Sequence, residues 1–272
     1  MTPTLTQITQ QTITVTHRAA EFILREFGRV SEDDIVTKSQ NSLVSYVDRE
    51  AEKILVAGLS DILPGCSFWT EEDTVEHTEG PWQWIIDPLD GTTNFLHGLP
   101  HFSVSVALRH HGELVVGVVV DVTKNETFSC FRGGGAYLND KPIRVSPTGR
   151  LADALIATGF PYYDYSLVGP FQETLQYFME HSRGLRRFGS AALDLAYVAC
   201  GRYDFFFEYA LHAWDMAAGI LLVEEAGGQV RDFDGNSESL VRGHIAAGST
   251  HSFDEAMAVV TRGFGRRAKP NK

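Results

Sequence analysis

The sequence predicts a mixed α/β fold, because two kinds of hydrophobic pattern alternate along its 272 residues. Apolar residues recur at helical spacing near the start, and short β-branched or aromatic runs, separated by turn residues, fill the middle. In the second half, strand-like runs alternate with helical segments. No internal repeat and no low-complexity linker divides the chain, so we expect its two halves to share one body.

Two amphipathic helices are predicted at the start of the chain. Thr2-Pro3 supplies a capping hydroxyl followed by proline at the first helical position, and apolar residues then recur at helical spacing until Gly28. A second helix is predicted over 47–59, because the apolar residues of this segment share one face and Pro64-Gly65 follows it.

Strands are predicted next, and then strands that alternate with helices. We interpret His111-Gly112 as a hairpin turn, and Gly133-Gly134-Gly135 as a hairpin turn that needs positive φ rather than as a phosphate loop. The predicted strands are 67–69, 82–86, 102–109, 113–121, 126–131, 154–157, 203–207 and 245–247. The predicted helices of the second half are 170–181, 191–199, 216–226 and 253–260.

Composition excludes several classes of protein. Hydrophobic residues make up 43% and charged residues 21%, which is too apolar for a disordered chain. Lys and Arg number 23 against 35 Asp and Glu, and the resulting charge of −12 argues against binding to nucleic-acid phosphates. No apolar run is long enough to span a membrane, and the start lacks a signal-peptide pattern. Three widely spaced cysteines fit neither a disulfide framework nor a zinc site, so we expect a cytoplasmic protein.

The segment Asp87-Pro88-Leu89-Asp90-Gly91-Thr92 carries the strongest chemical signal. A buried strand delivers Asp87 at its end, Pro88 has no N–H to continue the ladder, and a helical turn would make Asp87 and Asp90 face the same way. Two carboxylates about 4 Å apart repel by roughly 4 kcal/mol at an effective dielectric of about 20, which a cation or a raised pKa removes. Oxygen ligands favour Mg²⁺, and the following Gly91-Thr92-Thr93 suits a phosphate at a helix start. An Asp-Pro turn with a capping Asp is the alternative interpretation.

Two further acidic segments could belong to the same site. Glu71-Glu72 follows a strand-like run, and Asp215 lies at the start of an apolar helix. Taken alone, Glu71-Glu72 could be a solvated turn and Asp215 a simple N-cap.

Together, these segments resemble the inositol monophosphatase family of Mg²⁺-dependent phosphatases. The segment 87–92, with Glu71-Glu72 upstream and Trp214-Asp215-Met216-Ala217-Ala218-Gly219 downstream, matches the family's two-part signature in order and spacing. The resemblance covers about 37–249. It implies a layered αβαβα sugar-phosphatase fold, like that of fructose-1,6-bisphosphatase. We therefore expect one domain over 1–272, with a metal-site half at about 1–145 and a substrate half at about 146–265.

Carried over to this sequence, the resemblance implies a site with two to three Mg²⁺ ions. The implied metal oxygens belong to Glu71, Asp87, the Leu89 carbonyl, Asp90 and Asp215. The implied catalytic residues are Thr92 and Asp48, which together orient the attacking water, and Glu71. Asp48 could instead be only a helix-start acid. The implied substrate contacts are Asp90, Asp215, Glu208, His212 and the backbone N–H groups of Gly91, Thr92 and Ala191.

Three positions outside the metal ligands also bear on the resemblance. Lys38 matches a lysine of a loop near the metals. Thr70 stands where glycine is common, and Val47 stands where related enzymes have threonine beside Asp48. We expect these two departures to alter loop conformation rather than activity.

The resemblance implies hydrolysis of a small phosphomonoester, most simply myo-inositol monophosphate, by metal-activated water. Glu208 and His212 before Asp215 favour this substrate. Histidinol phosphate, fructose 1,6-bisphosphate, a nucleotide 3′-phosphate and NADP are alternatives, as is a non-catalytic regulatory protein that binds a partner on the same scaffold. The resemblance further implies lithium sensitivity and a homodimer, and we expect no nucleic-acid or membrane partner.

Overall fold

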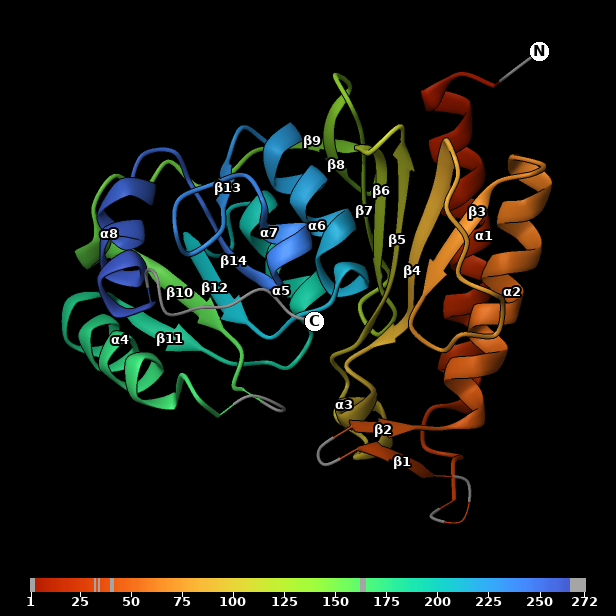
Figure 1. The fold of residues 1–272 in the computed structure, drawn as a ribbon, viewed down its shortest axis with the longest axis horizontal. Coiled ribbons are helices and arrows are strands. Elements are labelled where there is room, and N and C mark those ends of the chain that lie inside the picture. The colour runs from red at the N-terminus through yellow and green to blue at the C-terminus, as the bar shows by residue number, and fades with distance from the viewer. Residues whose placement is uncertain (1–2, 32, 34, 40–41, 162–164, 265–272) are drawn as a thin grey trace.

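The computed structural model describes residues 3–31, 33, 35–39, 42–161 and 165–264. Figure 1 shows them as alternating layers of helices and sheets. From one side to the other these are helices α1 (Leu5–Glu26) and α2 (Tyr46–Ile62), a seven-stranded sheet, helices α5 (Ala191–Ala199) and α6 (Ala213–Glu225), a five-stranded sheet, and helices α4 (Val168–His181) and α8 (Phe253–Phe264). The expected αβαβα order is confirmed.

The seven-stranded sheet is covered by helices on both faces, which explains its nearly continuous apolar strands. Its strands, in spatial order, are β3 (Ser67–Thr70), β4 (Trp82–Asp90), β5 (Ser103–His110), β6 (Glu113–Asp121), β7 (Glu126–Phe131), β8 (Gly135–Leu138) and β9 (Lys141–Ile143). β3 runs parallel to β4, and the other neighbours are antiparallel. The predicted hairpin turns are confirmed by positive φ at His111, Gly112, Gly133 and Gly135.

The five-stranded sheet belongs to the second half of the chain. Its strands, in spatial order, are β11 (Gly184–Arg186), β10 (Leu155–Thr158), β12 (Phe205–Tyr209), β14 (His244–Gly248) and β13 (Gln229–Arg231). The remaining elements are β1 (Val36–Ser39), β2 (Ser42–Val44), α3 (Thr92–Leu96), the 3₁₀ helix η2 (Leu151–Asp153) and α7 (Ser239–Arg242). β1 and β2 form a two-stranded antiparallel sheet.

The middle helix layer joins the two sheets into one core. α5 is buried at every position, as its almost wholly apolar sequence requires. One hydrophobic cluster contains Ile85 of the larger sheet, Leu193 of α5, Leu221 of α6 and Phe206 of the smaller sheet. The residues of both sheets are therefore positioned by the same packed helix pair.

The first helix begins later than the sequence suggests. Its N-cap is Thr4, whose side chain accepts a hydrogen bond from the backbone N–H of Gln7, whereas the predicted cap, Thr2, lies outside the described residues. Inside the helix, the buried hydroxyls of Thr12 and Thr16 donate to carbonyls one turn earlier, which satisfies them in an apolar environment. No described helix is both long and apolar enough to cross a membrane.

Candidate functional site

Strand β4 does not end at Pro88, as the sequence suggested, but continues to Asp90. Asp87 pairs with Ser105 of β5 and Asp90 pairs with Ser103, so β4 uses one residue more than β5 between these pairs. The extra residue forms a β-bulge, where a proline without an N–H is tolerated. Because side chains alternate along a regular strand, the bulge makes Asp87 and Asp90 face the same way. The predicted convergence is observed, but the predicted helical turn is wrong.

The carboxyl ends of β3 and β4 bring Glu71 next to Asp87. Thr70 pairs with Ile86 across these parallel strands, and the backbone N–H of Glu71 donates to the carbonyl of Ile86 over 3.2 Å. Glu71 and Asp87 directly follow this pair of residues, so they lie side by side. Two acids from separate segments of the sequence meet at one edge of the sheet.

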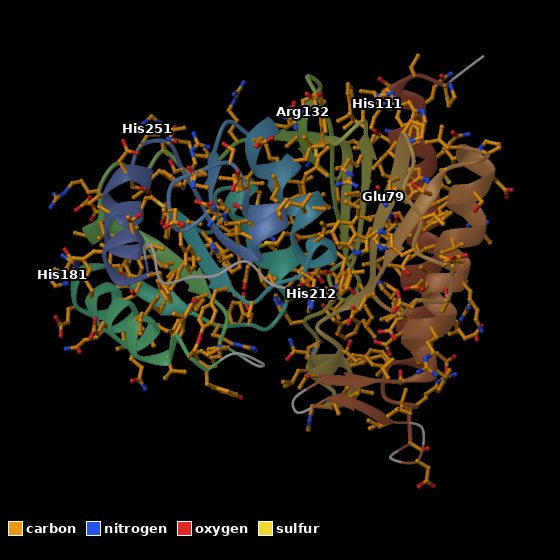
Figure 2. The ribbon with its side chains drawn as sticks, in the orientation of Figure 1. Glu79, His111, Arg132, His181, His212 and His251 are labelled. Carbon is orange, nitrogen blue, oxygen red and sulfur yellow. The ribbon has the colours of Figure 1, made fainter. Side chains whose placement is uncertain are left out.

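Asp215 approaches from helix α6, where it lies in the first turn rather than at the N-cap. Its carboxylate accepts a hydrogen bond from the backbone N–H of His212 over 2.6 Å. Ser105, the partner of Asp87 on β5, donates its hydroxyl to the carbonyl of Trp214 over 3.3 Å. This contact holds the start of α6 against the strands. The His212 ring stacks on Trp214, and Figure 2 labels it at one end of α6, between the two sheets.

The start of helix α5 holds the carboxylate of Asp90. Its Oδ2 accepts hydrogen bonds from the Ser190 hydroxyl and, over 2.9 Å, from the backbone N–H of Ala192. The backbone N–H of Ala191 also stabilises the ionised form. Negative charge is favourable at a helix N-terminus. The N–H of Ala191, which the sequence assigned to a substrate hydroxyl, therefore faces Asp90 in this structure.

The four acids repel one another. Burial and the charges of Glu71, Asp90 and Asp215 raise the pKa of Asp87 well above its usual range. Burial and the charge of Asp215 raise the pKa of Asp90 to about 7, although hydrogen bonds from Ser190 and from the start of α5 lower it. Ionising such groups costs folding free energy, which a cation among them would offset.

Thr92 lies between the acidic cluster and helix α2. Its hydroxyl is 2.9 Å from Oδ1 of Asp48. Oδ2 of Asp48 accepts hydrogen bonds from the backbone N–H and the hydroxyl of Ser45, both over 2.8 Å. Asp48 therefore caps α2 with one oxygen and contacts Thr92 with the other, so both interpretations of this residue describe real contacts.

The Thr92 hydroxyl has one proton and two acceptors. Besides Asp48, the carbonyl oxygen of Leu89 lies 2.9 Å from the same Oγ1. A hydroxyl donates one hydrogen bond at a time, so Asp48 and Leu89 compete for it. Burial raises the pKa of Asp48, against hydrogen bonds from Ser45 and Thr92 that lower it.

The backbone before Thr92 requires glycine. Gly91 has φ +96°, and a Cβ added there would lie 3.1 Å from the carbonyl oxygens of both Gly189 and His101. Asn94, to which the sequence assigned no role, donates from Nδ2 to the carbonyl of His101 over 2.8 Å and to that of Phe188 over 2.7 Å. This amide ties the Gly91–Thr92 turn to the loop before α5.

Glu208 occupies a space that only glycine leaves open. Thr158 of β10 pairs with Phe207 of β12, so the next residues, Gly159 and Glu208, lie side by side. A Cβ added at Gly159 would lie 1.8 Å from Oε1 of Glu208. The position of the Glu208 carboxylate therefore depends on the absence of a side chain at 159.

The charge environment links Glu208 to the other acids. Burial raises the pKa of Glu208 to about 8; Arg187 lowers it, and Asp215 and Asp90 raise it further. Asp194 of α5 is also fully buried, and burial and the charge of Glu208 raise its pKa well above the usual range. Its Oδ1 has no hydrogen-bond partner among the described residues. Asp194 was not predicted, because its place in the first turn of a helix is its only sequence feature.

Comparison with known proteins identifies the family to which this fold belongs. Residues 4–263 match the inositol monophosphatase family. A protein named inositol-1-monophosphatase from Rhizobium meliloti (strain 1021) is 44% identical over 246 residues, which are 90% of this chain and 92% of that protein. The chain belongs to the inositol monophosphatase family.

Relatives within the inositol monophosphatase family carry more than one name. A protein named Nus factor SuhB from Pseudomonas aeruginosa is 43% identical over 247 residues, which are 89% of this chain and 91% of that protein. The crystal structure of extragenic suppressor protein suhB from Bartonella henselae superimposes with a TM-score of 0.89 at 41% identity, and covers 94% of this chain and 98% of that one. Membership of the family therefore does not by itself identify the activity of this protein, which depends on the chemistry of its site.

The donor set of this family member fits a hard cation. The groups that converge are carboxylates and a backbone carbonyl, and oxygen donors are the ligands that Mg²⁺ prefers. Burial and neighbouring acids raise the pKa of Asp87, so a positive charge among them would favour its ionised form. Within the described part of the chain, no three His, Cys, Asp or Glu side chains already form a metal-binding group. In this structure Oδ2 of Asp90 accepts hydrogen bonds from Ser190 and Ala192.

The remaining predicted positions lie around the site. Lys38 belongs to β1, and its side chain lies outside the described residues. Val47 is fully buried in the α2 core, which explains why an apolar residue is tolerated beside Asp48. Thr70 keeps the extended conformation of β3 and donates its hydroxyl to Glu52, so the departure from glycine is accommodated by a new hydrogen bond.

Proposed function

We propose that this protein hydrolyses a small phosphomonoester, most simply myo-inositol monophosphate, with two to three Mg²⁺ ions. The observation that carries the proposal is the contact between the Thr92 hydroxyl and Asp48, beside four mutually repelling carboxylates. Such a cluster can bind cations, and such a hydroxyl can orient a water molecule for attack. Membership of the inositol monophosphatase family supports the same reaction.

Each group has a place in the proposed mechanism. Glu71, Asp87, the Leu89 carbonyl, Asp90 and Asp215 would hold the Mg²⁺ ions. When bound, these ions would lower the pKa of water and neutralise charge on the phosphate. The backbone N–H groups of Gly91 and Thr92 would bind the phosphate oxygens, because the glycine lets the backbone approach closely.

The Thr92–Asp48 pair would hold the proton that hydrolysis moves. When the Leu89 carbonyl is engaged elsewhere, the Thr92 proton has only Asp48 Oδ1 to bond. The lone pairs of Thr92 Oγ1 then accept a hydrogen bond from the attacking water and fix its direction. Ser45 holds the other carboxylate oxygen, so Asp48 cannot rotate away.

The direct test is phosphate release from a panel of phosphomonoesters at increasing Mg²⁺. The panel contains myo-inositol 1-phosphate, histidinol phosphate, fructose 1,6-bisphosphate, a nucleotide 3′-phosphate and NADP. We expect Mg²⁺-dependent release, fastest with the inositol ester. Faster release from histidinol phosphate would move the protein to another branch of the family, and no release from any ester would overturn the proposal. Li⁺ added to the same assay tests the expected lithium inhibition, and sedimentation tests the expected homodimer.

Substrate preference is expected to depend on Glu208. When Glu208 is ionised, above its pKa of about 8, a hydrogen bond from a ring hydroxyl to its carboxylate contributes about 1.5–3 kcal/mol, or roughly 10- to 150-fold in specificity. Glu208→Ala should lower kcat/KM for inositol monophosphate by that factor, with a much smaller loss for p-nitrophenyl phosphate. Gly159→Ala should produce the same pattern, because its methyl group displaces the flexible end of Glu208.

A matched control exists for this pair of variants. A Cβ added at Gly149 meets no atom within 4 Å, so Gly149→Ala should leave the ratio of the two substrates unchanged. Equal losses for both substrates in Glu208→Ala would remove this residue from substrate recognition.

A second candidate function is binding of a macromolecular partner on the same scaffold. The observation that favours it is the name of the Pseudomonas aeruginosa relative, Nus factor SuhB, at 43% identity. A charge of −12 favours a protein partner over direct contact with nucleic-acid phosphates. The proposed catalytic residues Thr92 and Asp48 are both present and in contact, so catalysis remains our first proposal.

A further inference from the structure

Glu52 is a buried carboxylate that the proposed mechanism does not use. It lies on α2 one turn after Asp48, on the same side of the helix, and its side chain is 0% exposed. Buried carboxylates are costly unless hydrogen-bond donors surround them. The donors around Glu52 therefore indicate what it does.

The last residue of β3 and the loop after it supply four hydrogen bonds to Glu52. Oε1 accepts from the hydroxyl of Thr70 over 3.0 Å, from the backbone N–H of Thr74 over 2.8 Å and from its hydroxyl over 2.6 Å. Oε2 accepts from the backbone N–H of Glu72 over 2.8 Å. Hydrogen bonds to an ionised acceptor are about twice as strong as neutral ones. A single side chain on α2 thus fixes the loop at three residues.

These three residues flank Glu71 on both sides. The backbone of Glu71 is also bound to Ile86 of β4, next to Asp87. The charges of Glu71 and Asp87 repel, so the loop needs an attachment that keeps Glu71 at the sheet edge before any cation binds. Glu52 is that attachment, and the hydroxyl of Thr70 adds to it.

We propose that Glu52 is a positioning residue, which holds residues 70–74 so that Glu71 stays beside Asp87 and thereby sets the affinity of the site for Mg²⁺. This inference rests on the proposed function, because it requires Glu71 and Asp87 to be metal ligands. Residues that orient metal ligands typically contribute 10- to 100-fold to metal affinity. Glu52 acts through Glu71, so its loss should weaken Mg²⁺ binding more than the rate at saturating Mg²⁺.

The test compares Glu52→Gln with Glu50→Gln, which removes the same charge from an exposed position on the same helix. Mg²⁺ binding is measured by calorimetry without substrate, and amide hydrogen exchange is measured on the metal-free full-length protein. We expect Glu52→Gln to weaken Mg²⁺ binding by about 10- to 100-fold and to speed exchange at the Glu72 and Thr74 amides. Its kcat should recover at saturating Mg²⁺, and Glu50→Gln should show neither change.

A milder pair of variants keeps the test valid if Glu52→Gln folds poorly. Thr70→Val removes the hydroxyl at nearly constant volume, and Thr70→Ser retains it. We expect weaker Mg²⁺ binding in Thr70→Val and wild-type affinity in Thr70→Ser. Unchanged Mg²⁺ affinity in both Glu52→Gln and Thr70→Val would overturn the positioning role alone. A wild-type protein that binds no Mg²⁺ would overturn the proposed function as well.

Discussion

The Asp90→Asn variant is expected to release phosphate about 10³-fold more slowly than the wild-type protein. In the absence of metal, the folded state of the variant is expected to be more stable than that of the wild type. Activity falls because an amide replaces a charged oxygen ligand, and hard cations bind through charged oxygens. Stability rises because burial and the charge of Asp215 raise the pKa of Asp90 to about 7, so its ionised form destabilises the fold at higher pH. Thermal unfolding in chelator should show a Tm increase of roughly 3–10 °C.

The stability gain of Asp90→Asn should depend on pH. An aspartate in the unfolded chain ionises near pH 4, about three units below the pKa of about 7 for Asp90 in the fold. Below about pH 4, Asp90 is protonated in both the folded and the unfolded state, so it does not reduce the free energy of unfolding. As the pH rises from about 4 through about 7, the unfolded chain ionises first, and the fold loses stability. The Tm difference between variant and wild type should therefore grow over this interval.

The control for Asp90→Asn is Asp61→Asn, which removes a charge from an exposed position on α2. It should change neither activity nor the Tm in chelator. Mg²⁺ at neutral pH should raise the Tm of the wild type more than that of Asp90→Asn. A constant Tm difference across the pH range, or full turnover by Asp90→Asn at ordinary Mg²⁺, would contradict the role assigned to Asp90.

The elements with long apolar patterns could be predicted from the sequence. The predicted segments 113–121, 126–131 and 191–199 coincide with β6, β7 and α5. Strands β1, β2, β8, β9, β11 and β13 were not predicted, and each has only three or four residues. So short a run has no readable period, and its pairing is decided by strands elsewhere in the chain.

The turn at Pro88 shows a second limit of sequence reasoning. A missing N–H predicts the end of a strand, and Pro88 does disturb the ladder. Only the register with β5 reveals that the strand absorbs the proline in a bulge and continues to Asp90. The motif therefore predicted the convergence of Asp87 and Asp90, which the structure shows, but with an incorrect local geometry.

The motif could not predict the residues that hold the acids in place. Ser190 and Ala192 contact Asp90 from about a hundred positions away in the chain, and Glu52 reaches across to Thr74. A signature records residue types and their spacing along one segment. Contacts between distant segments follow from the packing of α2, α5 and β4, which composition and periodicity do not encode.

Thr92→Ala is expected to lower kcat by roughly 10²-fold or more, the scale of a lost proton-transfer or orienting group. Mg²⁺ affinity should change little, because the Thr92 hydroxyl is not one of the proposed ligands. Asp48→Asn should produce a similar loss, since Oδ1 of Asp48 is the acceptor 2.9 Å from Thr92 Oγ1. If the two groups act as a unit, the double variant should be no slower than the slower single variant.

The cap function of Asp48 requires its own control, because Oδ2 also binds Ser45 at the start of α2. Ser45→Ala removes the capping hydroxyl, which should cost about 0.5–2 kcal/mol of stability, and leaves Thr92 and Asp48 in place. We therefore expect Ser45→Ala to lower the Tm with little effect on kcat, and Thr92→Ala to lower kcat with little effect on the Tm. Independent, multiplicative losses in Thr92→Ala and Asp48→Asn would show that Asp48 only caps the helix.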